Sequence, residues 1–239
     1  MTVSYDSIAE NNGILLDLPF TEGIGTVTRD RAKPHHSDVD LINTPTWETI
    51  ASGLGVLTFD RASQEYLELD TANSLDFNFE GGNYSISAWI RWEDPMTSVN
   101  IMGRYELDHS GWEVYLYAGG SGQNYLTQRH HHAGTLVSGN PRSGCYSEGW
   151  TPEVWWLFGS SRGGVGEATH YRNGVELPMV TGGLVDPESC AQDFLIGARY
   201  TKNADFYNGK MWRPRIWNRA LTEADWVNIF EKERDWFGV

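Results

Sequence analysis

The feature that most constrains this chain is an alternation of apolar and polar residues with a period of two. Within residues 85–91, apolar side chains fall on one face of an extended strand, whereas Trp89 falls on the opposite face. Residues 112–117 alternate in the same way, with Tyr115 and Tyr117 opposite the apolar side chains. Because successive residues of a strand point to opposite sides of a sheet, this pattern predicts half-buried strands.

Glycine-rich turns separate these strands at short intervals. Gly81-Gly82 and residues 162–164 are examples. Asn173-Gly174 is the strongest hairpin signal, because a two-residue type I′ turn needs positive φ at both positions. Many short strands joined by such turns predict an all-β protein, either a sandwich or a barrel.

One helix is expected near the C-terminus, over residues 222–232. Thr222 is a good N-cap, and Asp225 stands three residues later, where it can complete a capping box. The apolar positions around this segment would face the sandwich, and they are Leu221, Trp226, Ile229 and Phe230.

Length and charge restrict the domain organisation and the partners. A β-sandwich of 239 residues can form one domain, so we expect a polar lead-in over residues 1–12 and a single domain over residues 13–239. The formal net charge of −14 repels phosphate backbones, which argues against nucleic acid as a partner. No apolar run approaches the ~20 residues of a membrane span, and the first residues lack the basic and apolar regions of a signal peptide.

An ordered series of segments resembles the laminin G-like jelly-roll family of the concanavalin A-like lectins and glucanases. The resemblance extends from about residue 13 to residue 232. Its clearest pieces are Leu57-Thr58-Phe59-Asp60, Ser74-Leu75-Asp76, Ser85-Ile86-Ser87-Ala88-Trp89-Ile90, Tyr171-Arg172-Asn173-Gly174, Phe194-Leu195-Ile196-Gly197 and Arg215-Ile216-Trp217-Asn218-Arg219-Ala220-Leu221. The resemblance implies a two-sheet antiparallel jelly-roll sandwich with one short C-terminal helix.

The last strand departs from the family pattern. Relatives have an Asp-Glu pair where this chain has Trp212-Arg213, and Pro214 follows. Because proline cannot donate a ladder hydrogen bond, we expect this strand to be an edge strand or to be bulged there. Trp212 cannot replace the acidic residue that helps to hold a structural calcium in relatives, so no metal ligand is assigned. Calcium binding by acidic loops that include Asp60 stays open.

Tryptophan and tyrosine side chains are the candidate ligand-binding residues. The resemblance implies a glycan as the ligand, and exposed aromatic rings can stack on the apolar faces of sugars. We therefore expect a binding face that contains Trp89, Tyr115 and Tyr117, although each ring could instead pack under a loop. The alternative contact region is the segment of residues 119–149, which lacks sustained periodicity and is expected to be a long loop.

Acidic pairs raise the question of catalysis, because the same fold hosts retaining β-glucanases that use two carboxylates. Glu68 with Asp70, and Glu106 with Asp108, supply the first two acids of an E-x-D-x-E pattern and lack the third. No catalytic residue is assigned, and we expect that the protein is not an enzyme. A retaining β-glucanase-like glycoside hydrolase is the most distant alternative.

Histidines and cysteines offer further candidates. His130-His131-His132 could supply metal ligands, but a polar, partly exposed loop or strand is the preferred interpretation, as it is for His35-His36 with the nearby aspartates. Cys145 and Cys190 lie in loop-like stretches outside any C-x-x-C motif. One loop disulfide and two free thiols therefore both remain open.

The wider role is predicted from the two ends of the chain. With its own Met1 and no export signal, the chain is expected to be made in the cytoplasm and displayed on the outside of a virion or another particle as a structural or adhesive component. Trp236 and Phe237 are costly to leave in water, so they are the predicted docking residues for a capsid, a fibre or a second copy of the chain. Folding of both rings onto their own sandwich is the alternative, and a free carbohydrate-binding lectin is the alternative role.

Overall fold

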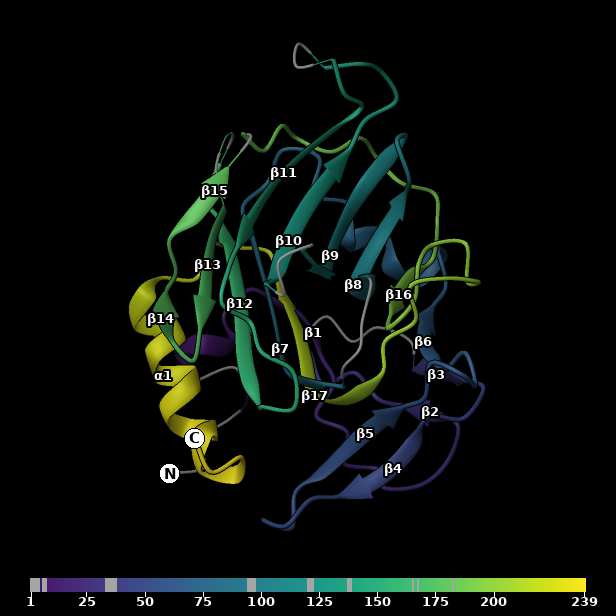
Figure 1. Ribbon diagram of the computed structural model, residues 1–239, viewed down its shortest axis with the longest axis vertical. Coiled ribbons are helices and arrows are strands. Elements are labelled where there is room, and N and C mark those ends of the chain that lie inside the picture. The colour runs from purple at the N-terminus through teal and green to yellow at the C-terminus, as the bar shows by residue number, and fades with distance from the viewer. Residues whose placement is uncertain are drawn as a thin grey trace.

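Two antiparallel β-sheets pack face to face in the computed structural model of the protein (Figure 1). The structure describes residues 5, 8–32, 38–93, 98–119, 123–136, 139–164, 166, 168–181 and 183–239. Within these residues, one α-helix lies near the C-terminus. The predicted all-β jelly-roll sandwich with one short C-terminal helix is therefore confirmed.

The first sheet has eight strands among the described residues. Their order is β14, β13, β12, β7, β17, β5 and β4, and β1 pairs with β17. Their bounds are β1 (Ile14–Asp17), β4 (Thr46–Thr49), β5 (Gly55–Phe59), β7 (Tyr84–Trp92), β12 (Trp156–Arg162), β13 (Ala168–Arg172), β14 (Val175–Glu176) and β17 (Gly209–Trp217).

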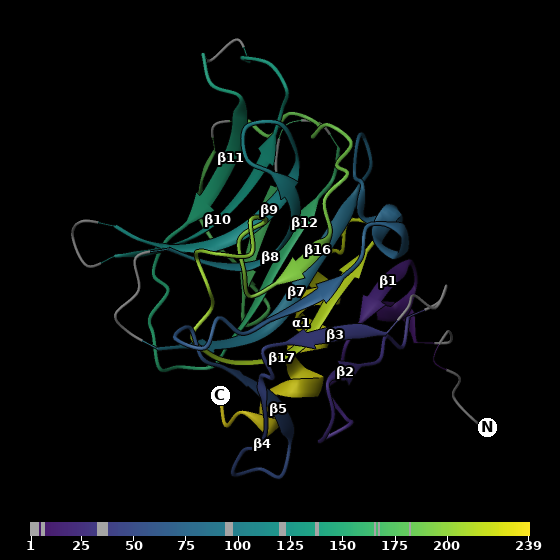
Figure 2. The same ribbon diagram turned by 90° about the vertical axis from the view of Figure 1, so that its right-hand side faces the viewer.

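The second sheet has nine strands in the described part of the chain, in the order β15, β11, β10, β9, β8, β16, β6, β3 and β2. Their bounds are β2 (Val27–Thr28), β3 (Val39–Ile42), β6 (Tyr66–Leu69), β8 (Ser98–Glu106), β9 (Ser110–Ala118), β10 (Asn124–His131), β11 (Arg142–Ser147), β15 (Met179–Thr181) and β16 (Phe194–Ile196). Figure 2 shows this sheet from the side, packed against β7 and β17 of the first sheet.

The outer face of the first sheet is covered by the C-terminal helix α1 (Glu223–Glu233) and the short 3₁₀ helix η4 (Arg234–Trp236). The predicted capping box is present, since the Thr222 side chain accepts from the Asp225 backbone N–H and the Asp225 carboxylate accepts from the Thr222 backbone N–H. Trp226 packs so closely on Gly159 that a Cβ atom there would lie 2.7 Å from the ring. None of the helices that the structure describes is long and apolar enough to cross a membrane.

The predicted hairpin turn and the predicted bulge are both present in the first sheet. Asn173 and Gly174 have φ values of 52° and 78° and join β13 to β14, as the hairpin signal predicts. The register of β17 against β7 shifts between Trp212 and Arg215, around Pro214. Because β17 pairs with β7 and β5, the strand is bulged at the proline and is not an edge strand.

The prediction of a long loop over residues 119–149 is wrong, because the segment contains β10 and β11. Its inward positions are largely polar, so the apolar alternation that marks a strand is missing. These side chains satisfy one another inside the sandwich: Gln128 donates to the Tyr84 hydroxyl and accepts from Ser160. The 3.0 Å contact between Ser147 Oγ and the ring of His170 belongs to the same buried polar layer.

The remaining elements and residues complete the domain. The short 3₁₀ helices are η2 (Ala9–Asn11) and η3 (Ala72–Phe77). Trp217 Nε1 donates to the Glu10 carbonyl oxygen at 2.6 Å, so the end of the predicted lead-in lies against the sandwich. The division at residue 12 stays a prediction. Cys145 and Cys190 are free, buried thiols.

Candidate functional site

The outward face of the second sheet carries the candidate site. On β9, Trp112, Val114 and Leu116 point into the core, which leaves Tyr115 and Tyr117 on the opposite face, as the alternation predicts. The register with β10 places Tyr125 opposite Tyr117 and Thr127 opposite Tyr115. These strands therefore bring several polar and aromatic side chains together on one surface.

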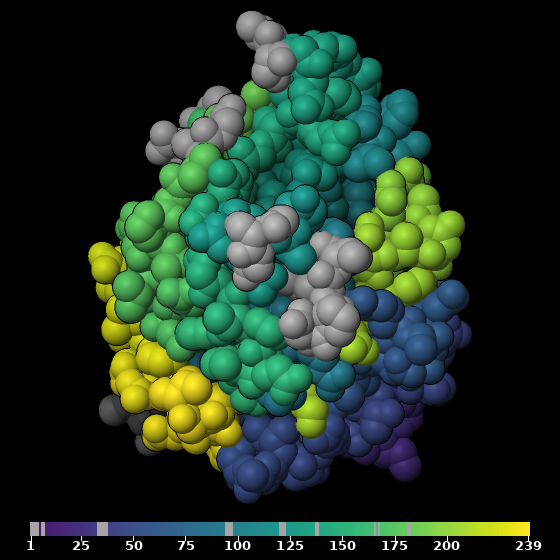
Figure 3. Space-filling model, viewed as in Figure 1, coloured from purple at the N-terminus to yellow at the C-terminus, as the bar shows by residue number. Residues whose placement is uncertain are grey.

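A groove of about 480 Å³ follows this surface across β9, β10 and β11 (Figure 3). Its aromatic end is formed by three tyrosines. The rings of Tyr117 and Tyr125 are stacked with centroids 6.3 Å apart, and Tyr146 meets Tyr125 edge-on at 5.2 Å. Tyr117 is 48% exposed, so its ring is available to a ligand.

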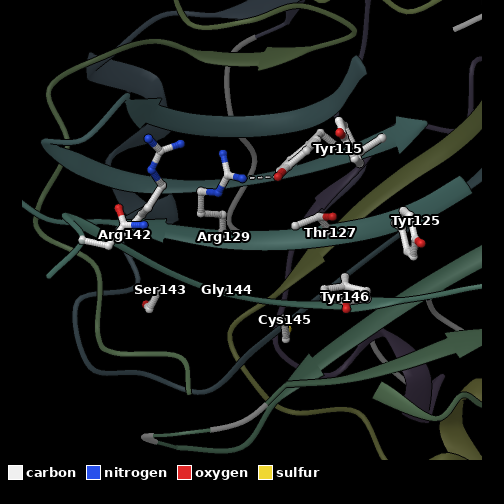
Figure 4. Close-up of a pocket in the computed structure, with 11 residues that line it drawn as sticks. Tyr115, Tyr125, Thr127, Arg129, Arg142, Ser143, Gly144, Cys145 and Tyr146 are labelled. Carbon is white, nitrogen blue, oxygen red and sulfur yellow. Dashed lines mark hydrogen bonds between the residues drawn. The ribbon is translucent and has the colours of Figure 1, made fainter. Parts of the chain in front are cut away.

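Two arginines form the other end of the groove (Figure 4). The Arg129 guanidinium lies 4.7 Å from the centre of the Tyr115 ring and donates to the Tyr115 hydroxyl. Arg142 Nε lies 2.9 Å from an Asp108 carboxylate oxygen. Burial raises the pKa of the Tyr115 phenol, although Arg129 acts in the opposite direction. The phenol is therefore neutral at physiological pH.

The buried carboxylate of Glu113 lies beneath the groove, between these arginines and β8. Its oxygens accept from Asn100 Nδ2 at 3.0 Å and from Arg129 Nη1 at 3.2 Å. They also contact His131 Nε2 at 3.2 Å. Because His131 Nδ1 accepts the Asp108 backbone N–H, the ring proton lies on Nε2 and is donated to Glu113. Glu113 is only 4% exposed, and these donors hold it in place.

Trp89 does not join this face, and its prediction as a ligand-contacting residue is corrected. It lies on β7 in the first sheet and is 0% exposed. Its ring stacks on Phe237 with centroids 4.1 Å apart, and its Nε1 donates to Glu233 at 2.8 Å. The alternation correctly separated Trp89 from the apolar face, but the C-terminal segment covers that opposite face.

The two predicted docking residues have different environments. Phe237 packs on its own sandwich, between Trp89 and Trp155. It is therefore not free to anchor a partner. Trp236 remains 46% exposed at the rim of a hollow of about 430 Å³ that Trp212 also lines.

The first pair of predicted acids is engaged in local contacts. Glu68 Oε1 accepts from Lys202 Nζ at 2.8 Å. Asp70 follows the end of β6 and accepts the Asn73 backbone N–H at 2.9 Å. The two carboxylates therefore have separate structural partners.

The second pair is divided by a turn. Glu106 ends β8 and accepts weakly from Gln192 at 3.4 Å. Asp108 lies in the following turn with φ of 62° and pairs with Arg142. The single strand face that a β-glucanase pattern needs is absent at this point.

The three consecutive histidines are all buried, so the expectation of partial exposure is wrong. His130 Nδ1 donates to the Val185 carbonyl oxygen at 2.7 Å, and its Nε2 accepts from the Tyr84 hydroxyl at 2.5 Å. Among the residues that the structure describes, no group of three or more His, Cys, Asp or Glu side chains could hold a metal ion. His35 and His36 lie outside the described residues.

Other acidic loop residues are also engaged locally. Asp60 accepts from the Ala62 backbone N–H at 2.8 Å and from the Ser63 hydroxyl at 2.7 Å, which stabilises its own turn.

The sequence did not predict Tyr125, Arg129 and Tyr146 as groove residues. The alternation of Tyr125, Thr127 and Arg129 was the available signal, and the polar inward residues between them obscured it.

Comparison with known proteins identifies the family. Residues 61–225 match the sequence profile of the concanavalin A-like lectin/glucanases superfamily, and the chain belongs to this superfamily. No curated protein matches the chain.

Several solved structures share the fold. The binding domain of botulinum neurotoxin DC, solved in complex with rat synaptotagmin II, is 14% identical with a TM-score of 0.68 over 93% of this chain and 52% of that chain. The botulinum neurotoxin serotype G binding domain is 14% identical with a TM-score of 0.67, over 92% and 51%. A structure of botulinum neurotoxin type C, whose cell entry is described as dependent on two ganglioside molecules, is 13% identical with a TM-score of 0.65, over 93% and 51%. The present chain spans about half the length of these structures, and the likeness shows the fold alone.

Proposed function

We propose that the protein is a non-catalytic, lectin-like module that binds a glycan in the groove on β9, β10 and β11. The observation that carries this proposal is the exposed Tyr117 ring, stacked on Tyr125 and followed along the groove by Arg129 and Arg142. Tyrosine faces can pack on the apolar face of a sugar ring, while arginine N–H groups can donate to its hydroxyls. Ganglioside and protein binding by the botulinum toxins adds support through the shared fold.

The absence of catalysis is part of the proposal. Glu113 is the buried carboxylate beneath the groove, and it already accepts from several protein donors. A nucleophile or general base needs a free lone pair directed at the substrate. Incubation with a panel of β-glucans should release no reducing sugar. Release that Glu113→Gln abolishes would contradict the proposal.

Glycan binding is tested by an array followed by calorimetry with the best ligand. Tyr125→Ala should weaken binding about tenfold, because the stacked platform is lost. Trp236→Ala removes an exposed ring outside the groove and should leave affinity unchanged. Equal affinity of wild type and Tyr125→Ala would locate the ligand elsewhere.

Display on a virion or another particle is a second, finer proposal, with Trp236 as the anchor. Its support is the exposure of this large apolar ring, whose burial against a partner is favourable. A soluble lectin that uses the same groove without docking is the alternative. Trp236→Ala should lower the amount of the protein that is incorporated into such a particle while leaving glycan affinity intact. Unchanged incorporation would favour the free lectin.

A further inference from the structure

A smaller hollow continues the groove toward β8. It encloses about 190 Å³ and shares Tyr115, Arg129 and Arg142 with the tyrosine groove, so the two spaces are adjacent. Its far side is formed by Asn100 and Asp205.

Asn100 leaves an unused hydrogen-bond acceptor in the lining of this hollow. The residue is 1% exposed, and its Nδ2 donates to Glu113 at 3.0 Å and to the Tyr105 hydroxyl at 3.2 Å. The carboxylate fixes the orientation of the amide, since the amide oxygen would be repelled by Glu113. The buried Oδ1 atom has no hydrogen-bond partner in the described part of the protein. Such an atom is costly unless a bound water or a ligand donates to it, and a ligand hydroxyl can take the place of the water.

The charges around the hollow are balanced. Arg129 pairs with Glu113 and Arg142 pairs with Asp108, while Arg199 lies 3.8 Å from Asp205. Each of these three arginines already has a carboxylate partner, so none of them is free to pair with an anionic ligand. The unused acceptor selects a donor instead, and an uncharged hydroxyl supplies one without disturbing the ion pairs.

The geometry points to a second sugar subsite in this hollow, which takes an uncharged, hydroxyl-bearing ring whose hydroxyl donates to Asn100 Oδ1. This inference rests on the proposed glycan binding at the tyrosines. One ring of the glycan stacks on Tyr117 and Tyr125, and a linked ring passes Tyr115 into the hollow. The preferred ligand is therefore a neutral disaccharide or longer chain.

The test is a calorimetric length series with glucose, galactose and mannose and their neutral di- and trisaccharides. For at least one of the three sugars, the trisaccharide should bind about fivefold or more tightly than the monosaccharide, as expected for added hydrogen bonds. Leu107→Trp enlarges a side chain that lines the hollow, at the opposite end of the β8–β9 hairpin from Tyr117, and it should remove this gain while preserving monosaccharide binding. Asn100→Ala should do the same, and thermal melts confirm that each variant is folded.

The outcomes distinguish failure of the second subsite from failure of the proposed glycan binding. Monosaccharide binding without a length-dependent gain, or a gain that survives both variants, overturns the second subsite and leaves the proposed function intact. Loss of monosaccharide binding in a folded Leu107→Trp protein also overturns it, because the two spaces would then act as one. Absence of binding by every sugar in the panel contradicts the proposed function itself.

Discussion

β7 and β9 carry the same kind of pattern, with aromatic residues opposite an apolar face, yet their outward faces differ completely. Trp89 on β7 is buried beneath Phe237, and its Nε1 donates to Glu233. Tyr117 on β9 is open to solvent in the floor of a groove. The difference arises because the C-terminal segment folds onto the first sheet, whereas no described element covers the tyrosines of the second sheet.

This contrast shows what an alternating pattern can establish. An alternation with a period of two shows which side chains lie on the same face of a strand. Whether that face is open depends on a segment far away in the sequence, since Phe237 near the C-terminus is the residue that covers Trp89. Aromatic residues opposite a core face therefore mark either a binding surface or a second packing layer.

The largest expected effect is on the covered face. Trp89→Ala removes a fully buried ring and leaves Glu233 without one of its donors, so it should lower the free energy of unfolding by about 3–5 kcal/mol. Urea denaturation measures this loss. Glycan affinity of the folded fraction should not change. A loss below about 1 kcal/mol, which is the range of surface substitutions, would mean that the face is not closed.

Acid pH provides a second test, directed at the polar layer between the two sheets. Burial lowers the pKa of both His130 and His170 from 6.5 to about 3, so the folded protein keeps these rings neutral. Below pH 6.5 the unfolded chain takes up protons that the folded chain does not. The stability that each of these two rings contributes is therefore fully present above pH 6.5 and should fall by about 1 kcal/mol per pH unit below it.

The pH dependence is measured by urea denaturation between about pH 7 and about pH 5, which brackets the ordinary histidine pKa. His170→Asn should make the slope shallower, because it removes one of the buried histidines that take up a proton only in the unfolded chain. A stability that does not change with pH over this range would contradict the buried, neutral state of these histidines.

The smallest effect on stability is expected on the open face. Tyr117→Ala should change the free energy of unfolding by about 0.5 kcal/mol or less, because the ring is half exposed. The same variant should weaken glycan binding, which is the reverse of the Trp89→Ala result. A large loss of stability would show that Tyr117 has a packing role that its exposure does not reveal.

The sequence predicted the fold well because its signals were local. The Asn173-Gly174 hairpin, the Thr222 capping box and the strand alternation depend on neighbouring residues, and the structure shows each of them. β10 and β11 were missed because Gln128, His130 and Ser147 point inward where apolar residues are expected. Their hydrogen bonds join strands from both sheets, so no local pattern records them. For the same reason, the groove residues Arg129 and Tyr146 could not be joined to Tyr115 and Tyr117.

The central claim is that a glycan binds at the tyrosines of the second sheet and not at the aromatic cluster around Trp89. Heteronuclear NMR during titration with a neutral trisaccharide tests this most directly, since the ring signals of Tyr117 and Tyr125 and the indole N–H signal of Trp89 report on the two faces separately. The tyrosine signals should shift in a saturable manner while the Trp89 indole signal stays unchanged. A saturable shift of the Trp89 signal, with the tyrosine signals unmoved, would contradict the claim.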